Sequence, residues 1–128
     1  MKVLILAVTL FASFGLMAKE LPTEPTDTAI KIDARFKEVL KDLDSFKNYA
    51  VTNNFVCKDA FKFGKAWCAC ARGNAKNSYG GYTGVKMYIA YFWPNGEIRI
   101  FDTAWQMGME QECSRQNWVE RDAGLLRQ

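Results

Sequence analysis

The sequence predicts an α+β fold in which an N-terminal amphipathic helix packs on a three-stranded antiparallel meander, with a short C-terminal helix. Three observations predict it. A long stretch repeats its apolar residues with a helical period, and three short stretches rich in aromatic and β-branched residues follow. The sequence Pro94-Asn95-Gly96 then places a tight turn between the last two of these stretches.

The helix is predicted over residues 27–50. Its apolar residues recur at spacings of three and four, as one face of a helix requires, and they are Ile32, Phe36, Val39, Leu40, Leu43 and Phe46. Charges of both signs occupy the opposite face. A basic amphipathic helix can lie on a membrane, but mixed charges favour a solvated face over a protein core.

Strands are predicted over residues 61–72, 85–93 and 97–101. The second is apolar on both faces, which indicates a central strand covered on each side. Two hairpin registers compete at the turn. A two-residue Asn-Gly loop would pair Pro94, which has no N–H, with Glu97, whereas a type I turn with Gly96 as a left-handed bulge pairs Trp93 with Glu97. We favour the second register, which places Tyr88, Ala90 and Phe92 on one face with Ile98 and Ile100.

The C-terminal helix is predicted over residues 110–122, ended by Gly124. Its apolar residues Met109, Cys113, Trp118 and Val119 fit helical spacing only loosely.

Residues 1–18 resemble a cleavable signal peptide. Met1-Lys2 precede an apolar run from Val3 to Leu16, and small Ala18 precedes charged residues. A membrane anchor is the competing interpretation, but a spanning helix needs ~20 apolar residues. We expect cleavage after Ala18, with Gly15 as the reserve site. Residues 19–26, which contain Pro22 and Pro25, are then a flexible leader before a single disulfide-stapled domain over residues 27–128.

Four cysteines follow the predicted cleavage site: Cys57, Cys68, Cys70 and Cys113. An even number in a small exported chain indicates disulfides, and a four-thiolate zinc site is disfavoured because its ligands usually come as two close pairs. Cys68 and Cys70 are two apart on a predicted strand and therefore badly placed to bond each other. Of the two remaining pairings we prefer Cys57–Cys68 with Cys70–Cys113 over Cys57–Cys70 with Cys68–Cys113.

The chain contains no histidine, which excludes histidine-activated nucleophiles and imidazole metal ligands. A carboxylate pair drawn from Glu97, Asp102, Glu110 and Glu112 remains possible, but no spacing selects one. The formal charge of +3 is too small and too scattered to indicate binding to nucleic acid or to an anionic membrane. We expect no cofactor, and the glycines of residues 73–84 do not have the spacing of a nucleotide-binding P-loop.

The stretch 73–84 joins the first two predicted strands and holds four glycines. As a ligand-contacting loop it offers the candidate binding residues Asn74, Lys76, Asn77, Tyr79, Tyr82 and Thr83, with side-chain charge, hydroxyls and broad aromatic faces. The alternative is a long hairpin connection whose tyrosines fold back onto the sheet.

The pattern Cys-x3-Asn-Ala-Lys-Asn-x2-Gly-Gly-Tyr-Thr-Gly from Cys70 to Gly84 resembles a motif of small exported bacterial proteins of unassigned function. Ala71 and Gly73 stand where that pattern has a glycine and an aliphatic residue, and Cys57 and Cys68 are additional. The resemblance implies a location in the bacterial periplasm or outside the cell and brings no activity with it.

We therefore expect a small exported, non-catalytic binding module whose partner is a protein or an envelope component. Inhibitors and immunity proteins fit this class, and the 14% aromatic content supplies side chains that often anchor interfaces. The alternative is a small histidine-free, carboxylate-dependent hydrolase acting on envelope polymers.

Overall fold

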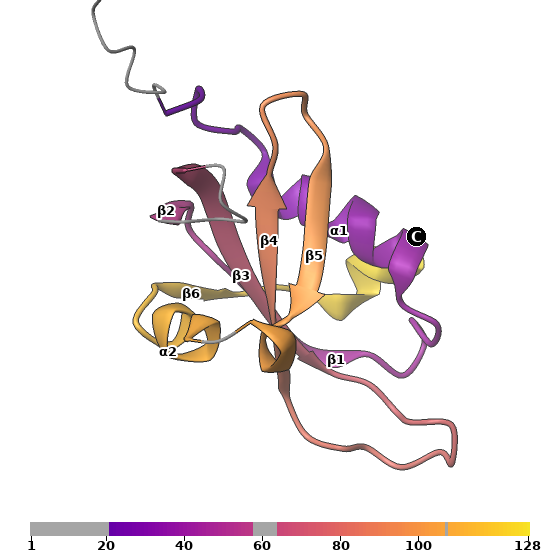
Figure 1. Ribbon diagram of the computed structural model, residues 1–128. Coiled ribbons are helices and arrows are strands. Elements are labelled where there is room, and N and C mark those ends of the chain that lie inside the picture. Colours follow the sequence, from indigo (N-terminus) through magenta and orange to yellow (C-terminus); the bar gives the residue numbers. More distant parts are fainter. Residues whose placement is uncertain (1–20, 58–63, 107) are drawn as a thin grey trace, which may run out of the picture.

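The computed structural model describes residues 21–57, 64–106 and 108–128, which form a six-stranded antiparallel sheet and several helical segments (Figure 1). The strands are β1 (Lys47–Thr52), β2 (Phe55–Cys57), β3 (Ala66–Asn74), β4 (Lys86–Phe92), β5 (Ile98–Asp102) and β6 (Trp118–Glu120). The helical segments are α1 (Thr28–Val39), η2 (Thr103–Trp105), α2 (Met109–Ser114) and η3 (Ala123–Arg127). None of these helices has the length and apolar character needed to cross a membrane.

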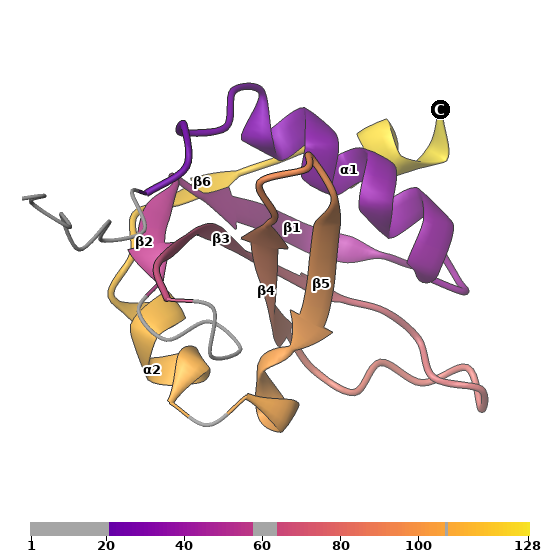
Figure 2. The same ribbon diagram turned by 45° about the horizontal axis from the view of Figure 1, so that its top comes forward.

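The sheet has the strand order β5-β4-β3-β1-β6, and β2 also pairs with β3. All pairings are antiparallel. Figure 2 shows β1 and β6 running across the direction of β4 and β5, so the sheet is strongly twisted. The nine-residue β3 lies at its centre and pairs with β1, β2 and β4.

The predicted arrangement, an N-terminal helix on a three-stranded meander with a short C-terminal helix, is wrong. The chain does combine helices with an antiparallel sheet, and the three predicted strands correspond to β3, β4 and β5. Three further strands extend the sheet beyond this meander. Residues 1–18 of the predicted signal peptide and residues 61–63 of the first predicted strand lie outside the described residues.

The helix predicted over residues 27–50 ends at Val39, because Leu40 has extended backbone angles. Leu40, Leu43 and Phe46 continue the apolar period without being helical. They pack into the same core as the buried face of α1, but from a turning connection. Residues 47–50, the last part of the predicted helix, belong instead to β1, which lies between β3 and β6.

The C-terminal prediction is wrong in a similar way. A helix starts close to the predicted position, at Met109, but ends at Ser114. Residues 118–120 then extend to form β6, which pairs with Ala50, Val51 and Thr52 of β1.

The predicted β4–β5 hairpin register is confirmed. The backbone N–H of Trp93 donates to the carbonyl oxygen of Glu97 at 2.9 Å, and Gly96 has a left-handed φ of 87°. Strand β4 lies between β3 and β5, and its two faces contribute to two different hydrophobic clusters, as expected for a central strand.

One cluster lies between the sheet and α1, with η3 beside the helix. It is built from Ile32, Phe36, Phe46, Tyr49, Val51, Ala69, Ala71, Ala90, Phe92 and Leu126. The cluster on the other face contains all four cysteines with Ile89 and Tyr91, and Met109 of α2 packs against it. Both faces of the sheet are therefore covered.

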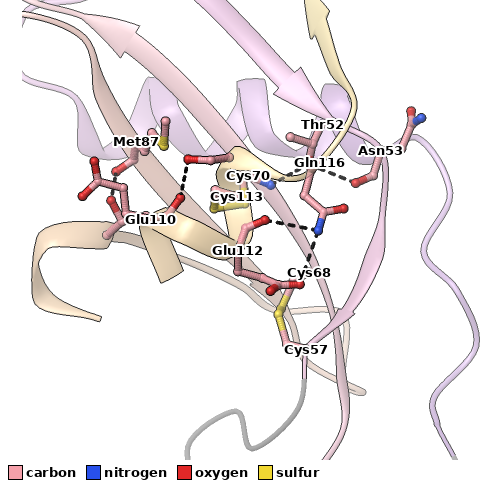
Figure 3. Close-up of a disulfide and its surroundings, with 12 residues drawn as sticks. Thr52, Asn53, Cys57, Cys68, Cys70, Met87, Glu110, Glu112, Cys113 and Gln116 are labelled. Atoms are coloured by element: carbon pink, nitrogen blue, oxygen red, sulfur yellow. Dashed lines mark hydrogen bonds between the residues drawn. A yellow bond between two sulfur atoms is a disulfide. The ribbon is translucent and has the colours of Figure 1, made fainter. Parts of the chain in front are cut away.

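The structure contains the disulfide pairing preferred from the sequence (Figure 3). Cys57 bonds Cys68 and Cys70 bonds Cys113, with Cα–Cα distances of 5.9 and 5.7 Å. Cys68 and Cys70 point to the same face of β3, so each reaches a different neighbouring segment: β2 for Cys68 and α2 for Cys70. The hydroxyl of Thr52 accepts a hydrogen bond from the Cys70 N–H at 2.8 Å beside this bridge.

Candidate functional site in the β3–β4 arm

The connection from β3 to β4 projects from the end of the sheet as a long hairpin (Figure 1). We call residues 74–84 the arm. Its two sides are joined by a β-bridge between Lys76 and Tyr82, so the arm continues the pairing of β3 with β4 beyond the sheet. It is therefore a short ribbon with its own hydrogen bonds.

The tip of the arm closes around Asn77. The backbone N–H of Asn77 donates to the carbonyl oxygen of Gly81 at 2.9 Å, and the Gly80 N–H donates back to the Asn77 carbonyl oxygen at 3.0 Å. The side-chain oxygen of Asn77 accepts from the N–H groups of Tyr79 at 3.0 Å and Gly81 at 3.1 Å. Gly80 adopts a left-handed φ of 80° that a side chain would disfavour. Asn77, a predicted binding residue, therefore uses its side-chain oxygen to build the tip.

The middle of the arm is fixed to the connection between α1 and β1. The hydroxyl of Tyr82 donates to the carbonyl oxygen of Ser45 at 2.8 Å, and the Lys76 N–H donates to the Ser45 hydroxyl at 3.1 Å. The Lys47 ammonium lies 3.8 Å from the centre of the Tyr82 ring, and that of Lys76 lies 5.6 Å from it. These contacts hold the arm in one direction relative to the sheet.

Tyr79 is the most exposed large hydrophobic side chain of the arm, at 97% exposed. Thr83 is also exposed, and so is Val85, which follows the arm. Trp105, 84% exposed, lies in η2 at the same end of the sheet, where the Thr103 hydroxyl donates to the carbonyl oxygen of Met87 in β4. This end of the molecule therefore presents large aromatic surface to solvent.

The predicted binding residues fall into three groups. Tyr79, Thr83 and Lys76 are exposed. Asn77 and Tyr82 hold the arm in shape, although Tyr82 keeps 41% of its surface exposed. Asn74 is buried at the end of β3, and its side-chain oxygen accepts no hydrogen bond from the described residues.

Sequence reasoning missed Ser45, Lys47 and Trp105. Ser45 and Lys47 precede the arm by about 30 residues along the chain and carry no motif, so only the fold brings them to Tyr82. The position of Trp105 just after a predicted strand could have marked it as a candidate surface residue. The sequence does not show, however, that its indole is exposed.

The four carboxylates considered from the sequence do not form a pair. Glu97 is bonded to Arg99 at 3.1 Å, Asp102 accepts from the Ala104 N–H at 2.9 Å, and Glu112 pairs with Arg115 at 3.6 Å, while Glu110 lies in the first turn of α2. Among the described residues, no three Cys, Asp or Glu side chains are grouped so that they could hold a metal ion.

The one carboxylate found buried in the described part of the chain is Asp33 of α1. Its oxygens accept hydrogen bonds from the Arg121 guanidinium and, at 2.7 Å, from the Tyr49 hydroxyl. Burial, followed by the hydrogen bond and the charge of Asp33, raises the pKa of Tyr49 well above its ordinary value. The group joins α1 to β1 and to the segment after β6, which is a structural role.

No protein-family model, no curated protein and no solved structure matches this chain.

Proposed function

We propose that this protein is a small exported, non-catalytic binding module that captures a protein or an envelope component with the arm. The observation that carries the proposal is Tyr79, 97% exposed at the tip of a hairpin whose shape is fixed by its own hydrogen bonds. Because the arm already has a fixed shape before binding, it loses little conformational entropy when a partner binds. Inhibitors and immunity proteins are one form of such a module.

Export is part of this proposal. Both disulfides are compatible with an oxidising compartment, and the N-terminal sequence has the pattern of a signal peptide. The periplasm and the extracellular space both meet this requirement. Mass spectrometry of natively purified protein should find a chain that begins at Lys19 and lacks four hydrogen atoms relative to its reduced form. An unprocessed chain with free thiols would contradict export.

The binding proposal is tested by affinity capture from an envelope extract, with the oxidised mature chain as bait. The variant Tyr79→Ala should weaken binding of the captured partner by about 30-fold, the effect of losing a hot-spot contact of about 2 kcal/mol. The variant Ile30→Ala is the matched control, since Ile30 is an exposed apolar residue of α1 outside the arm. Both variants should melt like the wild type.

Two outcomes would contradict the proposal. A captured partner that binds Tyr79→Ala as tightly as wild type would show that the arm does not make the contact. A large fall in melting temperature for Tyr79→Ala would show that the tip is scaffold.

The surroundings of the exposed glutamates do not favour the alternative function, a carboxylate-dependent hydrolase. Glu38 and Glu97 line one shallow hollow between α1 and the β4–β5 turn, but each is bonded to an arginine, Arg35 or Arg99. General acid–base work on a glycoside requires two carboxyl groups poised across the reacting bond. Glutamates neutralised by arginine in an open hollow do not favour this chemistry.

A further inference from the structure

The leader before α1 is attached to the domain in its described part. The indole N–H of Trp67 donates to the carbonyl oxygen of Pro22 at 2.7 Å. The side-chain amide of Asn54 donates to the carbonyl oxygen of Pro25 at 3.0 Å and to the Glu24 carboxylate at 3.2 Å. Residues 21–25 nevertheless belong to no helix or strand (Figure 1). Their position depends on these contacts.

The leader borders a groove with an aromatic wall. Trp67 of β3 and Phe92 of β4 are paired residues, and Trp93 and Pro94 continue the wall into the β4–β5 turn. A cavity of about 220 Å³ remains between this wall and the leader residues Pro22, Thr23 and Pro25. The leader therefore covers the groove without filling it.

The sequence Pro22-Thr23-Glu24-Pro25 has the Pro-x-x-Pro spacing. In a polyproline II segment, with three residues per turn, this spacing places both prolines on the same side. The burial pattern agrees, since both prolines are half-buried and the two residues between them are exposed. Such segments have no internal hydrogen bonds, so their carbonyl oxygens are free to accept from groups such as the Trp67 indole.

Proline-rich peptides are bound in this way by domains that offer an aromatic-lined groove and a hydrogen-bond donor. We propose that the groove formed by Trp67, Phe92, Trp93 and Pro94 is a second binding site, which takes extended Pro-x-x-Pro segments of partner proteins, with the leader as its resident occupant. The site lies at the β4–β5 turn, at the opposite end of β4 from the arm. It is thus independent of the proposed function of the arm.

The leader, which is part of the same chain as the groove, competes with a partner's Pro-x-x-Pro segment for the groove. A short tether gives a cis ligand an effective concentration in the millimolar range, so a free peptide must reach that range to displace it. Replacing both prolines of the leader weakens the resident occupant and leaves the wall intact.

The test uses the mature chain and a synthetic peptide with the sequence of residues 19–27. Calorimetric titration measures the peptide affinity of every variant, and the NMR signal of the Trp67 indole N–H reports the site of binding in the proteins that keep Trp67. The double variant Pro22→Ala/Pro25→Ala should bind the peptide at least tenfold more tightly than wild type does. Adding Trp67→Phe to this variant should lower the affinity at least tenfold, whereas adding Trp105→Phe, an exposed indole elsewhere, should leave it unchanged. A control peptide with alanine at both proline positions should not bind.

Equal binding of the two peptides, or no peptide-dependent shift of the Trp67 signal in the folded double variant, would overturn the proposal. Should that variant fail to fold, wild-type protein with millimolar peptide tests the same point, because displacement of the leader must shift the backbone N–H signals of its own residues Thr23 and Glu24. A wild-type dimer that dissociates when the two prolines are replaced would assign the groove to the leader of a second copy and overturn the assignment to a partner.

Discussion

The hydroxyl of Tyr82 donates a hydrogen bond to the carbonyl oxygen of Ser45 at 2.8 Å, across 37 positions of the chain. This bond joins the returning side of the arm to the segment that enters β1. The arm therefore keeps its direction through a contact that local sequence does not encode.

The first prediction concerns this bond. Tyr82→Phe removes the hydroxyl and keeps the ring beside the two lysines. We expect trypsin to cleave after Lys76 several times faster, with a small change in melting temperature, because one exposed hydrogen bond contributes about 0.5–1.5 kcal/mol. Tyr79→Phe is the control, since it deletes the hydroxyl of a tyrosine that is 97% exposed. Equal cleavage rates for both variants would show that the bond does not hold the arm.

The second prediction concerns the close approach of Gly73 to Phe46. A Cβ atom on Gly73 would lie 1.9 Å from Cζ of the fully buried Phe46 ring. We expect Gly73→Ala to lower the free energy of unfolding by about 1–3 kcal/mol through overpacking. Urea denaturation measures the loss.

Gly81→Ala is the matched control for this variant, because its Cβ would meet only the Asn77 side-chain oxygen, at 3.9 Å. Adding Phe46→Leu to Gly73→Ala should cost less than the sum of the two single changes, since the shorter side chain vacates the space. If the losses in the free energy of unfolding are simply additive, the destabilisation by Gly73→Ala does not come from a clash with Phe46.

The third prediction ranks the disulfides. Cys70–Cys113 spans 43 positions and Cys57–Cys68 spans 11, so the first constrains the unfolded chain more. Replacing each pair with alanine should lower the free energy of unfolding by about 4 and about 3 kcal/mol respectively, on the chain-entropy account. Chemical denaturation of the two double variants tests the order. A reversed order would mean that native packing around the bridges outweighs loop length.

The fourth prediction concerns alkaline pH. The pKa of Tyr49 is raised in the folded protein by burial and by Asp33, while in the unfolded chain the phenol titrates near 10.0. Above that pH the unfolded state binds fewer protons than the folded state, so stability falls as pH rises. Burial also raises the pKa of Tyr88 and Tyr91, which adds to the fall in the same direction.

Tyr49→Phe should therefore flatten this dependence. We expect it to lower stability at pH 7 by about 1–3 kcal/mol through loss of the bond to Asp33, and to lose less than wild type between pH 9 and pH 11 (roughly the range around the tyrosine pKa). Urea denaturation across this range provides the measurement. A slope identical to that of wild type would show that Tyr49 does not contribute to the alkaline loss.

The parts of the fold that local patterns determine were predictable. The β4–β5 hairpin follows from Pro94-Asn95-Gly96, because proline excludes one register and glycine permits the left-handed bulge of the other. The disulfide pairing follows in part from the alternation of side chains along β3, which keeps Cys68 and Cys70 from bonding each other.

The parts that depend on distant pairing were not predictable. The spacing of apolar residues indicates which residues are buried, not which backbone conformation they adopt. Leu43 and Phe46 therefore continue the helical period in the sequence, although they lie in a turning connection after α1. The three residues of β6 are too few to show an alternation and extend only because β1 pairs with them. Within the arm, glycines indicated a loop, but the anchoring at Ser45 requires the folded chain.

Both covalent cross-links start from β3, and this determines how the protein would carry mechanical load. Tension applied to the two chain ends would pass from Cys57 through sulfur to Cys68, along two peptide bonds to Cys70, and through sulfur to Cys113. The arm, β4 and β5 lie within the loop closed by the second bridge and would bear none of this tension. The backbone of the arm would therefore carry no load, although its bonds to Ser45, which precedes Cys57, would break once that segment is drawn out.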